Sequence, residues 1–137
     1  MLYFKFVIFF VMSINLYANN LVVIVSKNSN IHTISKKELS KIFLSKTRNL
    51  PNGKKSFLVE IDDKVIKSKF YKEICNKNEN QLRKYWTKMI FTGKGQPPKK
   101  IKSINEIIKY VANNKNAISY IPSQYINNSI QTIMEIK

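Results

Sequence analysis

The feature that most constrains the fold is an aliphatic run, Leu21 to Val25, with no polar side chain on either face. Side chains of a strand alternate between its two faces, so a strand of this kind has to be covered on both sides. Most of these residues are β-branched, which favours a strand over a helix. The run therefore predicts a strand that is buried in a mostly parallel sheet.

Strand and helix patterns alternate along the rest of the chain, and three of the helices have marked starts. Ser35 with Glu38, Asn78 with Gln81, and Ser103 with Glu106 have the spacing of a capping box. Helices are predicted after residue 35, over 67–75, after 78 and after 103, and further strands over 57–61, 117–121 and 130–136. This alternation predicts an α/β fold with a mixed, mostly parallel sheet of about four strands, flanked by helices.

Residues 1–18 have the pattern of a secretory signal peptide. Lys5 supplies a positive charge, residues 6–12 form an apolar run, and Ala18 is the small residue at a cleavage site. A retained membrane anchor is the alternative, although the run is shorter than the roughly 20 apolar residues that a bilayer core requires. We expect a periplasmic protein with one domain over 19–137, without a stable membrane anchor once the signal is cleaved.

The charge of the chain favours anionic ligands. Its net charge is +16, from 24 basic and 8 acidic residues. Arg48 and Arg83 are the only arginines. Lysine lacks the planar guanidinium group with which arginine forms two hydrogen bonds to a base or a phosphate. The charge therefore indicates a solvated basic surface and small anions as partners, and no nucleic acid is expected.

No catalytic, metal or cofactor site is expected. His32 is the only histidine, and no serine elbow or paired base accompanies it. The adjacent carboxylates Asp62 and Asp63 lack the further oxygen ligands that a metal ion needs. Cys75 is the only cysteine, so it forms no internal disulfide, and its spacing predicts a buried apolar role. A protein without enzymatic activity is favoured.

One stretch that could bind an anion follows the predicted strand 57–61. In an α/β layer, the loop after a strand meets the start of a helix, whose free N–H groups attract anions. Lys64, Lys67 and the hydroxyl of Ser68 are the candidate ligand-binding residues there. The alternative is that Asp62, Asp63 and Ser68 only cap the helix.

A second candidate stretch is the run Thr92-Gly93-Lys94-Gly95, with Thr92 and Lys94 as candidate ligand-binding residues. It is not a P-loop, because its glycines follow a helix instead of preceding one and no Ser or Thr follows Lys94. Gly93 stands where a helix C-terminus favours a left-handed residue. We therefore interpret the stretch first as a helix end and second as a ligand loop, and Trp86, before it, as a core residue.

The order of segments resembles a known family. The strings "VVIVSKNSNIHTISKKELSKIFLSK", "PNG", "QLRKYWTKMIFTGKGQPP" and "NAISYIP" are similar to the phosphate ABC transporter substrate-binding family, in its short, single-lobe members. The resemblance implies one lobe of a type II periplasmic binding protein. It also implies binding of phosphate or another oxyanion, for uptake or sensing and without catalysis.

The resemblance also leaves alternatives open. Full-length phosphate binders carry a Ser-Gly-Thr stretch before the second helix, and Lys64-Val65-Ile66 stands in that place here. This departure favours a module that binds no ligand and docks to an envelope or transporter protein. A basic nucleic-acid binder is the third alternative, and it rests on charge alone.

Overall fold

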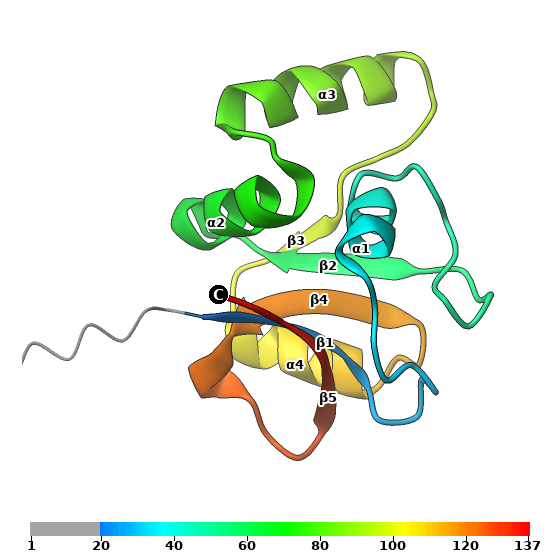
Figure 1. Ribbon diagram of the computed structural model, residues 1–137, viewed down its shortest axis with the longest axis vertical. Helices are drawn as coiled ribbons and strands as arrows, with labels where there is room; N and C mark the ends of the chain where they lie inside the picture. The colour runs from blue at the N-terminus through cyan, green and yellow to red at the C-terminus, as the bar shows by residue number, and fades with distance from the viewer. Residues whose placement is uncertain (1–19) are drawn as a thin grey trace, which may run out of the picture.

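The computed structural model describes residues 20–137, and the predicted signal peptide lies outside them. Its centre is a five-stranded sheet with the order β3-β2-β4-β1-β5 (Figure 1). The strands are β1 (Leu21–Ser26), β2 (Phe57–Ile61), β3 (Lys99–Ile101), β4 (Ala117–Pro122) and β5 (Ile130–Ile136). The α/β fold with a sheet between helices is therefore confirmed.

Four strands of the sheet run in one direction and β1 runs against them. β2 pairs in parallel with β3 and β4, whereas β1 pairs antiparallel with β4 and β5. Every residue of β1 is buried, as its aliphatic run predicts. β5 forms the edge of the sheet next to β1.

Helices cover both faces of this sheet. They are α1 (Lys36–Phe43), α2 (Lys64–Cys75), α3 (Glu79–Phe91) and α4 (Ile104–Ala112), with a short 3-10 helix η1 (Ser123–Tyr125). Because β3 and β4 lie on opposite sides of β2, right-handed crossovers place α2 and α4 on opposite faces. α4 packs against all five strands, and α3 lies beyond α2 in Figure 1. No helix within residues 20–137 is long and apolar enough to span a bilayer.

An aromatic cluster joins the first two helices to the sheet. The ring of Phe70 in α2 stacks on Tyr120 of β4 with centroids 3.8 Å apart, and Phe43 of α1 meets Phe70 edge-on at 4.7 Å. All three side chains are buried. Trp86 is also buried, as predicted, while Cys75 is free and only half-buried.

Three details of the fold differ from the sequence predictions. α2 begins at Lys64 and not near Lys67, because the Asp63 carboxylate caps it by accepting from the amides of Val65 and Ile66 at 2.9 and 3.0 Å. The three-residue strand β3 was not predicted, since its exposed lysines lack the alternation of a half-buried strand. The capping boxes at residues 35 and 78 are both present. At Ser103 only the hydroxyl accepts from the Glu106 amide, so the helix cap is present without the second bond of the predicted box.

Candidate anion-binding site

A cavity of about 390 Å³ lies between α2 and α3, and we call it the α2–α3 cavity. It begins at Asp62 and Asp63, directly after the carboxyl end of β2, where α/β sheets commonly bind ligands. One face of α2 and one face of α3, along most of its length, form its walls, and Pro97 and Lys100 also line it.

The structure brings three of the five predicted site residues together. Lys64, Lys67 and Ser68 all lie on the first turns of α2 and line the α2–α3 cavity. Arg83 of α3 and Lys100 of β3 join them there, and sequence reasoning did not find these two. No local pattern could have found them, because the three elements meet only in the folded chain.

Thr92 and Lys94 lie elsewhere, at the end of α3. The Thr92 hydroxyl donates to the Lys88 carbonyl at 2.7 Å, and the Lys94 amide donates to the Met89 carbonyl at 3.0 Å. Gly93 has a φ of 67° and donates to the Ile90 carbonyl, which completes a Schellman motif. This segment therefore ends a helix, as predicted, and neither Thr92 nor Lys94 lines the α2–α3 cavity.

Cations outnumber carboxylates around the cavity. Its charged lining residues are Lys64, Lys67, Lys77, Arg83 and Lys100 against Asp62, Asp63 and Glu79. Arg83 pairs with Glu79 at 3.5 Å. Lys64 and Lys100 form no salt bridge within residues 20–137, so their charges are available to an anion.

A buried carboxylate, that of Glu60, pairs with one of the lysines that line the cavity. Glu60 of β2 is 0% exposed, and its Oε2 accepts hydrogen bonds from the hydroxyls of Tyr71 at 3.0 Å and Tyr120 at 2.9 Å. The Nζ of Lys67 lies 3.6 Å from Oε1. Burial raises the pKa of Glu60, which the charge of Lys67 and the two hydroxyls partly offset. Lys67 is therefore already paired with the carboxylate of Glu60.

Glu60 was not predicted as a functional residue, although its place in an apolar strand is unusual. Glu60 is the only charged residue in the predicted strand 57–61, and a charge inside such a strand needs a partner. The partners come from α2 and β4, and burial raises the pKa of Tyr71 and Tyr120 well above the usual range. The cluster is internal and does not line the cavity, apart from Lys67 and Tyr71.

Trp86 contributes an unused hydrogen-bond donor. Its side chain is buried and lines the α2–α3 cavity, and its indole Nε1 has no acceptor among the described residues. Buried donors are nearly always paired in folded proteins.

The fold is that of one lobe of a periplasmic solute-binding protein. It superposes on a phosphate ABC transporter substrate-binding protein from Clostridium perfringens, solved with bound phosphate, with a TM-score of 0.66 and 18% identity, over 83% of this chain and 44% of that chain. PstS from Borrelia burgdorferi gives a TM-score of 0.62 and 20% identity, over 82% and 46%. An ABC-type phosphate transport receptor from Vibrio cholerae gives 0.56 and 13%, over 84% and 45%.

These similarities confirm the predicted resemblance at the level of the fold. The chain spans less than half the length of each of these proteins. No family model and no curated protein matches the sequence. Within residues 20–137, no group of three or more His, Cys, Asp or Glu residues could hold a metal ion.

Proposed function

We propose that this chain is an exported, non-enzymatic solute-binding module that takes a small oxyanion of the phosphate class in the α2–α3 cavity. The observation that carries the proposal is the meeting of Lys64, Arg83 and Lys100, from three separate elements, around one cavity. Cations held at fixed positions recognise oxyanions through charge-assisted hydrogen bonds. The signal-like residues 1–18 support export, and the shared fold supports solute binding.

The local geometry indicates weak binding that is sensitive to salt. Asp63 already accepts from the amides of Val65 and Ile66, so the start of α2 offers few free donors to an anion. Recognition then depends on lysine and arginine side chains near solvent, whose attraction is screened by ions. The ring of Trp86 contributes to the cavity wall.

Trp86 is the only tryptophan of the chain, so its fluorescence reports on this cavity. We expect phosphate or sulfate to change that fluorescence in a saturable way, and the affinity to fall as ionic strength rises. The double variant K64Q/K100Q should bind roughly tenfold more weakly, because two charge-assisted contacts are lost.

The matched control is Lys115→Gln, an exposed lysine in the turn between α4 and β4. It removes one charge far from the cavity and should leave the affinity unchanged. Isothermal titration calorimetry provides a second measurement. No heat and no fluorescence change with any oxyanion would reject the proposal, as would equal binding by the double variant.

A specific observation favours protein docking as a second candidate function. At the end of α3, Phe91 is 92% exposed and Ile90 is 56% exposed, with Arg83, Lys84 and Lys88 on the same helix. Exposed large apolar side chains mark protein interfaces, where aromatic residues and arginine are enriched. The candidate partner is an envelope or transporter protein.

This second candidate predicts crosslinks that depend on position. A photoreactive amino acid in place of Phe91 should give adducts of defined mass in envelope extracts, whereas the same group in place of Lys115 should give none. Replacing Ile90 with alanine should reduce the yield at position 91. Identical adducts from both positions would contradict a docking role for the end of α3.

A further inference from the structure

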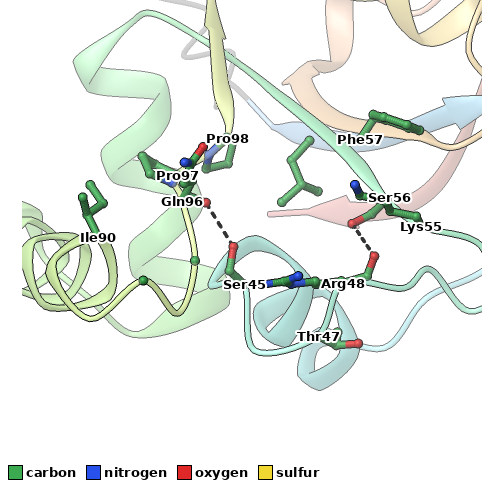
Figure 2. A pocket seen from close by; sticks show the side chains of 13 residues that line it. Ser45, Thr47, Arg48, Lys55, Ser56, Phe57, Ile90, Gln96, Pro97 and Pro98 are labelled. Atoms are coloured by element: carbon green, nitrogen blue, oxygen red, sulfur yellow. Dashed lines mark hydrogen bonds between the residues drawn. The ribbon is translucent and has the colours of Figure 1, made fainter.

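A second cavity, of about 500 Å³, lies at the opposite end of β2, where that strand begins. Three segments line it: the turn 45–48 after α1, the start of β2 at 55–58, and the loop 93–98 after α3. In Figure 2, Ser45, Gln96 and Pro97 lie around one space with Ile90 of α3 beside them, whereas the ring of Phe57 lies on the other side of β2. We call it the seam cavity.

The walls of the seam cavity are held in place by the protein itself. The Ser45 hydroxyl donates to the Gln96 carbonyl at 3.0 Å, which ties the first segment to the third (Figure 2). The Ser56 amide and hydroxyl donate to the Arg48 carbonyl at 2.8 and 3.1 Å, which ties the first to the second. A cavity whose walls are already joined needs little ordering when a ligand binds.

The charges that line this cavity are all positive. Among the residues that the structure describes, the charged lining side chains are Arg48 and Lys55, and no carboxylate lines the cavity. Neither of them forms a salt bridge in that part of the chain. Arg48 is one of two arginines in a lysine-rich sequence, and its planar fork suits two-point contact with a carboxylate or phosphate.

One side of the lining is apolar. It consists of Ile90, which is 56% exposed, with Leu58, Pro97 and Pro98, while Ser45, Thr47, Ser56 and Gln96 add polar groups elsewhere in the lining. The volume lies within the range of about 300 to 1,000 Å³ that is typical of small-molecule sites. An inorganic ion alone would leave these apolar side chains in contact with water, so the lining suits a ligand with an apolar part.

We propose that the seam cavity is a second binding site, for a small aromatic anion that carries a carboxylate or phosphate group. The anionic group lies against Arg48 and Lys55, and the ring packs on Ile90 and Pro97. The proposal does not depend on oxyanion binding in the α2–α3 cavity, because the charged residues of the two cavities are different.

The test is a titration of the ¹⁵N-labelled full-length chain with phenyl phosphate and benzoate, followed by ¹H–¹⁵N NMR. We expect saturable shifts of the amides in 45–48, 55–58 and 93–96. Phenol lacks the charge and inorganic phosphate lacks the ring, so each should bind at least tenfold more weakly at these amides. Arg48→Gln should weaken benzoate binding roughly tenfold and Ile90→Ala several-fold.

The control for these variants is Lys109→Gln, an exposed lysine of α4 on the other face of the sheet, which should bind benzoate like the parent chain. The side chains of Arg48 and Ile90 are exposed, so both variants should fold, and an unchanged thermal midpoint verifies this. The proposal is overturned by equal binding of phenol, by unchanged affinity in Arg48→Gln, or by no saturable shift. Shifts confined to Lys64, Lys67 and Ser68 would place the ligand in the other cavity and also overturn it.

Discussion

Replacing Glu60 with alanine should lower the free energy of unfolding by about 3 kcal/mol, measured by chemical denaturation. The carboxylate is 0% exposed and is the acceptor for the hydroxyls of Tyr71 and Tyr120. Without it, two buried donors lose their partner, and each unpaired group costs about 1 to 3 kcal/mol. The missing side-chain volume adds a cavity term. A loss below about 1 kcal/mol would mean that this cluster contributes little to the fold.

Glu60→Gln is the matched control, because it keeps an oxygen that can accept from the tyrosines and removes only the charge. Burial holds the pKa of Glu60 above its ordinary value of 4.5. Between that value and the raised pKa, the unfolded chain has lost a proton that the folded chain retains. Stability that depends on Glu60 is therefore present at low pH and decreases as pH rises through this window.

The unfolding free energy of the parent chain, minus that of Glu60→Gln, should therefore decrease as pH rises from about 4.5. Other titrating groups are common to both proteins and cancel in the difference. A difference that stays flat across the window, or that rises with pH, would show that burial does not control this carboxyl group.

Gly95→Ala should lower the free energy of unfolding by about 2 kcal/mol, through a steric clash between two loops. A Cβ at position 95 would lie 2.7 Å from the Cβ of Ser45 and 3.1 Å from the Cε of Met89. The Ser45 Cβ is fixed to a backbone with φ of 55°, so rotating its side chain cannot relieve the contact. Thermal or urea denaturation measures the loss.

Ser45→Gly should restore most of the stability of the Gly95→Ala chain. It removes the clashing Cβ and relieves the left-handed backbone of Ser45, at the cost of the hydrogen bond to the Gln96 carbonyl. The two substitutions should therefore be strongly non-additive. Gly53→Ala is the control: it adds a Cβ at a φ of 81° with nothing within 4 Å, and Ser45→Gly should not rescue it. Additive losses for the pair 45 and 95 would contradict the contact.

Much of the fold follows from local patterns. The aliphatic run at β1, the capping boxes at Ser35 and Asn78 and the left-handed Gly93 all depend on residues within one or two turns of one another. Such signals do not depend on residues elsewhere in the chain, so the α/β class and the positions of most helices and strands could be predicted. On the predicted site, Lys64, Lys67 and Ser68 share one cavity because they share one helix turn.

The strand directions and the long-range contacts of the site depend on the tertiary structure. It reversed β1 relative to its neighbours, paired the short β3 with β2, and brought Arg83 and Lys100 to Lys64. It also enclosed Glu60 between tyrosines from α2 and β4, and joined the turn at Ser45 to the loop at Gly95. None of these contacts has a periodic signal, because each joins residues far apart in the chain whose meeting depends on strand order and on the packing of side chains.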